Sequence, residues 1–345
     1  MAVVKADGYG HDAKVVSEKA IKGGASQLGV ATLKEGIKLR SFGINAPILV
    51  LGNLYTKKDL LICFRNDLMP TVSTFRECLI CNNIGKSNNF KFSLHLKVDT
   101  GMSRLGFECD QFNQQFNIIK SLENIAVKGI YSHLACADEK NALNPKSSTQ
   151  LQKEKFQELL KIIDIDNTEN IKIHLANSAG MILGKDFHFD MVRVGLSMYG
   201  YSPLANINEN LFLKPALFLK AKVTFVRTIE KGIGVSYGNK FVSDRKTKLA
   251  VLSIGYADGI IRNLSGKISL IHNKKLYTQV GSITMDQMMV DITDSNDIEV
   301  GSTMLLLGSE GDKSISPIDW ADKCNSIPWE ILCSFKNRLP RVQVD

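Results

Sequence analysis

The sequence contains no apolar run approaching the roughly 20 residues that a helix needs to span a membrane. Its amino terminus also lacks the charged region, apolar stretch and small-residue cleavage site of a secretory signal. We therefore expect a cytoplasmic protein without a membrane segment. At 345 residues with 44% hydrophobic content, the chain is large enough to bury substantial cores and to form one or two domains.

Neither the charges nor the cysteines are arranged as a framework for binding or cross-linking. The formal charge of +8 comes from scattered lysines rather than one basic stripe, which favours a solvated surface over a nucleic-acid site. Seven cysteines are an odd number without regular spacing, which indicates a reducing compartment rather than a disulfide scaffold. Cys78 and Cys81 form a CxxC motif within a helical pattern, and no second metal-ligand pair follows. We interpret both as core residues and assign no metal or nucleic-acid partner.

The first two-thirds of the chain alternate between short β-branched runs and longer amphipathic segments. The eight runs are MAVVKA, LGVATL, APILVLG, LMPTVST, FSLHLKVDT, VKGIYSHL, IKIHLANS and MVRVGLSMYG. The helical segments between them include HDAKVVSEKAIKGG and SSTQLQKEKFQELLKII. Eight such units are what a closed (β/α)8 barrel requires, so we predict an α/β fold with a TIM-like barrel. An open doubly wound sheet is the alternative.

The pattern changes after about residue 213, where closely spaced strand-like runs are separated by turn residues. Only the segment SISPIDWADKCNSIPWEILCSF has helical character in this part of the chain. We therefore predict a barrel domain over residues 1–213 and a mostly-β domain over residues 214–345.

Polar side chains follow the predicted barrel strands at the points where such barrels carry their chemistry. They are Lys5 and Tyr9 after the first run, Lys97, Asp99 and Arg104 at the fifth, His133 at the sixth, Asn177 and Ser178 at the seventh, and Arg193 and Gly195 in the eighth. A lysine at a strand end can form a Schiff base with an aldehyde cofactor and later act as a base. This chemistry fits pyridoxal 5′-phosphate (PLP).

Three of these segments are predicted to form a phosphate cradle. Ser178 and the backbone amides of Gly195 and Leu196 are expected at helix starts or tight turns, where N–H groups favour an anion. Tyr9 could donate a further hydrogen bond. The cradle is generic when taken alone.

Eight segments, in their order and spacing, resemble the PLP-dependent alanine racemases over nearly the whole chain. They are VVKADGYGH, LKVDTGMSRLGF, YSHLACADE, HLANSAG, MVRVGLSMYG, VSYG, SIGYADG and MDQMMVDIT. The pair VVKADGYGH and GYADG is specific, whereas either alone would be weak. The resemblance implies an N-terminal PLP barrel, a C-terminal β domain, and interconversion of L- and D-alanine that supplies D-alanine for peptidoglycan.

The resemblance further implies a two-base reaction. Lys5 resembles the lysine that holds PLP covalently and exchanges the α-proton of the D-enantiomer, and Tyr256 resembles the base for the L-enantiomer on the opposite face. Inversion at Cα needs one proton removed from one face and one delivered to the other, which two bases achieve without moving the substrate. A phenol is a weak base in water, so a cation must favour its ionised form, and His133 and Arg193 are candidates.

Further site residues carry over from the family by position. Arg193 resembles the arginine that faces the PLP ring nitrogen, where a guanidinium cannot accept a proton and leaves the ring neutral. Arg104 resembles the arginine near the cofactor's phenolic oxygen and the substrate carboxylate. Met285 and Asp286 resemble the segment that borders the substrate, and Lys97 matches a lysine that is carbamylated in some members.

In the family, the segments of Tyr256 and Met285 enter the site from a second subunit, which implies a homodimer with shared active sites. Family members usually carry a further strand and helix before the first run, so we expect either a translation start upstream of Met1 or a shortened protein. A non-catalytic PLP-binding protein and a racemase of serine or broader specificity are alternatives. A PLP barrel decarboxylase is disfavoured by Arg193, because decarboxylation benefits from a protonated ring.

Overall fold

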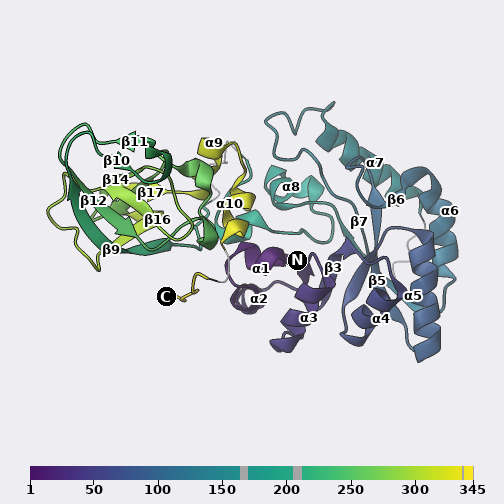
Figure 1. Ribbon diagram of the computed structural model, residues 1–345. Coiled ribbons are helices and arrows are strands. Elements are labelled where there is room, and N and C mark those ends of the chain that lie inside the picture. Colours follow the sequence, from purple (N-terminus) through teal and green to yellow (C-terminus); the bar gives the residue numbers. More distant parts are fainter. Residues whose placement is uncertain (164–169, 205–211, 336–337, 345) are drawn as a thin grey trace. The chain divides into compact units, whose positions relative to one another are not determined.

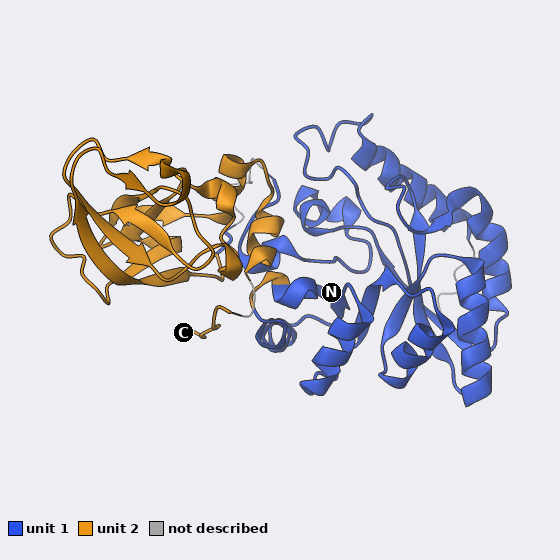
Figure 2. Cartoon of the chain, viewed as in Figure 1, with its two compact units in different colours: residues 1–8, 12–214 blue, residues 9–11, 215–345 orange. Residues whose placement is uncertain are grey.

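The structure is a computed structural model that describes residues 1–163, 170–204, 212–335 and 338–344. The chain divides into two compact units (Figure 2). Unit 1 comprises Met1–Gly8 and Asp12–Lys214, and unit 2 comprises Tyr9–His11 and Pro215–Asp345. The short segment Tyr9–His11 therefore groups with unit 2 although it follows Lys5 closely in the sequence.

Unit 1 contains a parallel sheet (Figure 1). Its strands run in the order β1-β2-β3-β4-β5-β7-β8, with β6 paired to β5. The strands are β1 (Ala2–Val3), β2 (Leu28–Val30), β3 (Ile48–Asn53), β4 (Met69–Val72), β5 (Phe92–Asp99), β6 (Phe107–Glu108), β7 (Ile125–Tyr131) and β8 (Lys172–His174). A parallel bridge joins Ala2 to Val194, and Arg193 N donates to Ala176 O at 3.0 Å. The eighth segment thus connects to both ends of the sheet, and the predicted (β/α)8 barrel is confirmed.

The eighth run differs from its prediction as a strand. Val194 forms only the bridge, and the chain then enters a 3₁₀ helix, η3 (Leu196–Tyr199). The N–H groups of Gly195 and Ser197 donate to Ser178 Oγ instead of to a neighbouring strand. A side chain at the start of α8 (Ser178–Leu183) therefore replaces the ladder partners that would extend this strand.

Helices lie on the outside of the unit 1 sheet (Figure 1). They are α2 (Ala13–Lys22), α3 (Leu33–Ser41), α4 (Lys57–Arg65), α5 (Phe75–Asn88), α6 (Cys109–Lys120), α7 (Ser148–Ile162), α8 (Ser178–Leu183) and the 3₁₀ helix η2 (Lys185–Phe187). Hydroxyl N-caps begin four of them, namely Thr32, Thr56, Thr74 and Ser147. The inward faces bury apolar side chains against the strands, and Cys78 and Cys81 on α5 are fully buried in this core, as predicted.

Unit 2 is built on an antiparallel sheet of order β13-β14-β15-β12-β9-β16-β17, with a separate β10–β11 hairpin. Its strands are β9 (Leu219–Ile229), β10 (Gly234–Val235), β11 (Phe241–Val242), β12 (Thr247–Leu252), β13 (Ser269–His272), β14 (Lys275–Val280), β15 (Met288–Asp291), β16 (Thr303–Glu310) and β17 (Lys313–Ile315). The predicted helical segment forms α9 (Pro317–Cys324) and α10 (Pro328–Ser334), separated by Asn325 in the left-handed conformation. Three short 3₁₀ helices complete the unit, η4 (Tyr237–Asn239), η5 (Tyr256–Asp258) and η6 (Arg262–Leu264).

The first half of β9 shows why this region reads as a half-buried strand. Leu219, Ala221 and Val223 are buried, whereas the intervening Lys220 and Lys222 are exposed, which is the period-two pattern of a sheet with one solvated face.

None of the described helices of either unit combines the length and the apolar character that crossing a bilayer requires.

Candidate active site

The candidate site of unit 1 lies at the carboxyl ends of its parallel strands. Because parallel strands end at one edge of a barrel, residues far apart in sequence meet there. Lys5 follows β1, Lys97 and Asp99 end β5, and His133 follows β7. The loops after these strands and β8 carry the remaining positions, which are Arg104, Asn177, Ser178, Arg193, Gly195 and Leu196.

Arg193 is the central cation of this group and is only 3% exposed. Its Nη2 group donates to the carbonyl oxygens of Ser132 at 2.7 Å and Leu175 at 2.9 Å. The guanidinium also lies 5.0 Å from the ring centroid of Tyr131, a favourable cation–π distance. Burial lowers the pKa of Arg193 to about 10, with Tyr131 acting in the opposite direction, so the group remains charged at neutral pH.

Two hydrogen bonds from Arg193 fix the protonation of neighbouring histidines. Nη1 donates to His174 Nδ1 at 2.8 Å, and Nη2 donates to His133 Nδ1 at 3.0 Å. A guanidinium can only donate, so both Nδ1 atoms are acceptors and both neutral rings carry their proton on Nε2. Burial and the charge of Arg193 hold the pKa of each of these histidines well below its usual range.

The same constraint passes from His174 to His95 on β5. His174 Nε2 lies 3.0 Å from His95 Nδ1 and must be the donor, so His95 accepts at Nδ1. Burial, followed by the charge of Arg193, lowers the pKa of His95 to about 3. His95 is fully buried. The structure places His174 directly against Arg193.

Lys97 is a second buried cation in the barrel mouth, at 5% exposure. Its Nζ atom lies 5.9 Å from the Tyr131 ring centroid. Burial and the charges of Arg104 and Arg193 lower the pKa of Lys97 to about 8, although Asp99 opposes the shift. An amine with such a pKa is partly neutral at physiological pH and is therefore nucleophilic.

The loop that carries Arg104 is shaped by Asp99. Asp99 Oδ1 accepts from Gly101 N at 2.8 Å and Met102 N at 2.9 Å, and Oδ2 accepts from Arg104 N at 3.1 Å. Burial opposes the carboxylate charge, but these backbone bonds, with one from Ser103, hold the pKa of Asp99 below its usual range. The side chain of Arg104 is exposed and makes no hydrogen bond within the described ranges, so it is available to a carboxylate ligand.

The residues of unit 1 fit PLP at three points. Ser178 Oγ accepts hydrogen bonds from the N–H groups of Gly195 at 2.9 Å and Ser197 at 3.4 Å, so these two backbone groups lie side by side. Ser197 Oγ is buried without a partner among the described residues, as expected for a hydroxyl that faces a bound phosphate. Arg193 makes its hydrogen bonds through Nη1 and Nη2 within the described chain, so its Nε–H is available to a ring nitrogen. Lys5 carries an amine that can form a Schiff base.

Tyr256, Met285 and Asp286 lie together in unit 2. Tyr256 N donates to Thr284 O at 3.0 Å, so the two segments run side by side. A side chain at Gly255 would overlap the carbonyl oxygens of Thr284 and Met285, which explains the glycine before Tyr256. Tyr256 is 41% exposed and Met285 is 52% exposed.

Arg338 cross-links these two segments of unit 2. Its Nε atom lies 3.3 Å from Asp258 Oδ1, and Nη2 donates to Asp286 Oδ1 at 2.8 Å. Asp258 Oδ2 in turn accepts from Gly255 N at 2.9 Å. An open groove of about 940 Å³ adjoins them and is lined by residues that include Arg227, Tyr237, Tyr256, Met285, Asp286 and Gln287.

Tyr9 is buried in the short segment that belongs to unit 2. Burial, followed by the charge of the neighbouring Cys333, raises the pKa of Tyr9, so its hydroxyl stays protonated and remains a hydrogen-bond donor.

The sequence analysis missed four residues of these two groups, namely Tyr131, His174, Ser197 and Arg338. Tyr131 and Ser197 lie within the YSHL and GLSMYG runs, so their closeness to strand ends was a usable signal. Nothing local marks His174 or Arg338.

Each of the two units matches the model of a known protein family. Residues 1–203 match the model of the alanine racemase N-terminal domain, and residues 216–343 match that of the C-terminal domain. The chain belongs to the alanine racemase family. This family is PLP-dependent, in agreement with the fit of the barrel residues to that cofactor.

Individual members of the family resemble the chain over its full length. It is 53% identical to the alanine racemase of Prochlorococcus marinus, covering 100% of this chain and 89% of the relative, and 43% identical to that of Synechocystis sp., covering 100% and 91%. Among solved structures, alanine racemase from Bartonella henselae with covalently bound pyridoxal phosphate superposes with a TM-score of 0.87 at 30% identity, covering 99% of this chain and 92% of that one. The Bacillus anthracis enzyme with bound L-Ala-P has a TM-score of 0.89 at 32% identity, covering 100% and 88%.

Proposed function

We propose that this protein is an alanine racemase that interconverts L- and D-alanine with PLP and supplies D-alanine for peptidoglycan. The observation that carries the proposal is the fixed cation Arg193, held by carbonyl groups and two neutral imidazoles at the barrel strand ends where Lys5 also lies. The family relationship supports the racemase activity and not the non-catalytic alternative.

Lys5 holds the cofactor covalently in this proposal. Ser178, Ser197 and the amides of Gly195 and Leu196 hold its phosphate, and Tyr9 and Asn177 are further proposed cofactor-binding residues. Asn177 Oδ1 caps α8 by accepting from Gly180 N at 2.9 Å, which fixes the start of this helix beside Ser178. When bound, PLP withdraws electrons from Cα of the amino acid and makes its α-proton acidic.

Arg193 keeps the cofactor ring unprotonated, because a guanidinium with a pKa of about 10 donates a hydrogen bond at Nε and does not deliver its proton at neutral pH. Lys5 Nζ moves the α-proton on one face and Tyr256 Oη moves it on the other. Arg104 binds the substrate carboxylate, bordered by Met285 and Asp286. Lys97 is a candidate for carbamylation beside Arg104, supported by its lowered pKa of about 8.

The active form is proposed to be a homodimer in which Tyr256, Met285 and Asp286 complete the site of the partner subunit. The exposed side chains of Tyr256 and Met285 beside an open groove support this arrangement, because a second copy would cover them.

The proposal includes a domain boundary near residues 213 and 214. A cytoplasmic location is also included, supported by seven cysteines that are free thiols.

Racemisation of L-alanine by the purified chain with added PLP, followed by D-alanine formation, tests the activity. Parallel reactions with L-serine measure how specific the site is for alanine. D-alanine release without comparable D-serine release supports the proposal. Cofactor binding without release of either D-amino acid would contradict it.

Mixing two inactive variants tests the shared site. Lys5→Ala and Tyr256→Phe homodimers each lack one base at both sites, whereas a mixed dimer has one site with neither base altered. We expect activity to return after subunit exchange, towards about a quarter of the wild-type value when exchange is statistical. A mixed dimer as inactive as its parents would contradict the assignment of Tyr256 to the partner's site.

A further inference from the structure

The turn that presents Lys5 is left-handed. Ala6, Asp7 and Gly8 have φ values of 52°, 54° and 64°, and Tyr9 continues the run with a φ of 53°, so the segment marked α1 (Lys5–Tyr9) is not an ordinary helix. L-residues rarely occupy this region in succession, because Cβ approaches the following carbonyl oxygen. Such a run persists only where its surroundings hold it in place.

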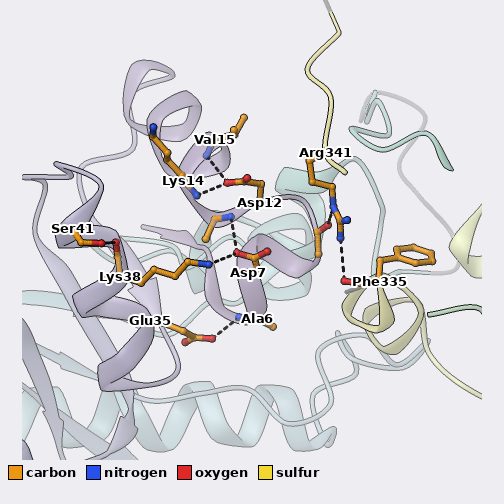
Figure 3. Close-up of polar contacts among 12 residues, drawn as sticks. Ala6, Asp7, Asp12, Lys14, Val15, Glu35, Lys38, Ser41, Phe335 and Arg341 are labelled. Carbon is orange, nitrogen blue, oxygen red and sulfur yellow. Dashed lines mark hydrogen bonds and ion pairs between the residues drawn. The ribbon is translucent and has the colours of Figure 1, made fainter. Parts of the chain in front are cut away.

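Glu35 supplies one of those restraints from the first turn of α3 (Figure 3). Its Oε1 atom accepts from Ala6 N at 2.8 Å, directly after Lys5 and across 29 residues of sequence. Its Oε2 atom accepts from Ala31 N at 2.7 Å and Thr32 N at 3.0 Å. The two carboxylate oxygens therefore join the lysine turn to the end of β2 and the start of α3.

Asp7 supplies a second restraint within the turn (Figure 3). Its Oδ1 atom accepts from Ala13 N at 3.3 Å and lies 3.4 Å from Lys38 Nζ, while its carbonyl accepts from Asp12 N at 3.0 Å. The ion pair with Lys38 is well exposed on both sides and is therefore weak. The bond from Ala6 to Glu35 is the charge-assisted contact closest to Lys5 in the sequence.

Another helix of unit 1 carries the same capping motif without the contact to the lysine turn. Glu77 occupies the equivalent position of α5, where Oε2 accepts from Ser73 N at 2.7 Å and Thr74 N at 3.2 Å. Both helices form a complete capping box. Glu35 differs in that its other oxygen also has a backbone donor.

We infer that Glu35 is a positioning residue for Lys5, holding the left-handed turn so that the lysine amine is directed to the cofactor. The inference rests on the proposed function in one respect, because it takes Lys5 as the PLP lysine. Glu35 acts through the backbone of Ala6 and needs no contact with cofactor or substrate.

Two substitutions separate this role from helix capping. In Glu35→Gln, one carboxylate oxygen becomes an N–H₂ group, which cannot accept from the backbone N–H that it faces. In Glu35→Asp, the side chain is one methylene shorter, which keeps a capping box but shortens the reach to Ala6. Asp319 of α9 demonstrates that aspartate serves this cap, because its Oδ2 atom accepts from Ser316 N at 2.7 Å. Glu77→Gln and Glu77→Asp are the matched controls.

The first readout needs no cofactor. Hydrogen exchange of the backbone amides in residues 5–12 is measured on the full-length, PLP-free chain for all four variants. We expect both Glu35 variants to exchange about tenfold faster in this segment than the Glu77 variants, which corresponds to losing one charge-assisted hydrogen bond. Equal exchange in the Glu35 and Glu77 variants would overturn the inference.

The second readout is the affinity for PLP, measured by absorbance of the covalent adduct, together with its rate of formation. We expect the Glu35 variants to bind PLP about tenfold more weakly than the Glu77 variants, with kcat lowered more than KM is changed. Similar losses in the two pairs would mean that only the cap matters and would overturn the inference. A wild-type chain that forms no adduct would instead contradict the proposed function, and the hydrogen-exchange comparison would still decide the role of Glu35 in the turn.

Discussion

Arg193 and His174 form a hydrogen bond of 2.8 Å between Nη1 and Nδ1, and this bond requires the His174 ring to be neutral. The donor is a cation, so a protonated His174 would place two positive charges against each other without a shared acceptor. The next bond, from His174 to His95 at 3.0 Å, extends the requirement for a neutral ring to β5. The barrel mouth thus holds the positive charge of Arg193 beside histidines that stay neutral.

Acid should destabilise the protein through these histidines. The folded-state pKa values of His95 and His174 lie below the unfolded value of about 6.5, so the unfolded state takes up protons first as the pH falls. The free energy of unfolding is therefore unaffected by these histidines above about pH 6.5 and decreases below it. Each histidine that stays neutral costs about 1.4 kcal/mol of stability per pH unit between pH 6.5 and its folded pKa. Urea unfolding between pH 8 and pH 4 measures this slope, and His95→Leu should make it shallower by about one proton. An unchanged slope in that variant would contradict the neutral assignment of His95.

Removing the amine of Lys5 should abolish covalent cofactor binding. We expect Lys5→Ala to lack the absorbance of the covalent PLP adduct while retaining the fold, because the side chain of Lys5 is only partly buried and makes no hydrogen bond in the described chain. Lys14→Ala, at an exposed lysine of α2, is the control and should bind PLP as the wild type does. A full adduct signal in Lys5→Ala would mean that another lysine holds the cofactor.

Substitution of Tyr256 should affect the two enantiomers unequally. Tyr256→Phe removes the proposed acid–base group for L-alanine while leaving Lys5 to exchange the proton of D-alanine. In single-turnover exchange of the α-proton with solvent, we expect a loss of at least about a hundredfold from the L-enantiomer and a much smaller loss from the D-enantiomer. Equal losses from both would rule out the two-base assignment.

Lys97 should react with carbon dioxide near neutral pH. With a pKa of about 8, roughly one amine in ten is neutral at pH 7, far more than for an ordinary lysine. We expect a carbamate carbon signal in nuclear magnetic resonance spectra recorded with ¹³C-labelled bicarbonate, growing as the pH rises through 8. The same signal in Lys97→Met would show that the carbamate forms elsewhere.

The protonation of Lys97 also affects stability with a definite sign. The unfolded state binds a proton that the folded state lacks between pH 8 and about 10.5, so the unmodified lysine makes folding more favourable as the pH rises across that window. Lys97→Met should lose this contribution to the pH dependence. Unfolding curves in bicarbonate-free buffer separate it from carbamylation.

The glycine before Tyr256 should tolerate no side chain. A Cβ atom at Gly255 would overlap the carbonyl oxygens of Thr284 and Met285 and force the Tyr256 segment away from them. We expect Gly255→Ala to lower the free energy of unfolding by about 3 kcal/mol. Gly301→Ala is the control, because its Cβ would meet open space and only its φ of 95° is unfavourable, at a cost of about 1 kcal/mol. Similar losses in both variants would contradict the packing argument.

The barrel and the order of its site residues followed from the sequence because their causes are local. A strand has a period of two and a helix a period of 3.6, so alternation between them can be read from short windows. Parallel strands end at one edge, so Lys5, Lys97, His133 and Arg193 could be assigned to that edge before any contact was known. The eighth run was the exception, because the hydroxyl of Ser178 takes the N–H groups that a strand would have used.

The sequence alone therefore determined the architecture of this protein and predicted that the proposed site residues follow its strands. Only the tertiary structure decided how those residues are held, as in the chain of bonds from Arg193 through His174 to His95 and in the bond from Ala6 to Glu35. The physical reason is that periodicity is set by backbone geometry over a few residues, whereas these contacts join side chains and backbone groups from separate strands and loops. Whether such groups meet, and therefore which of them can be charged, depends on closure of the whole barrel.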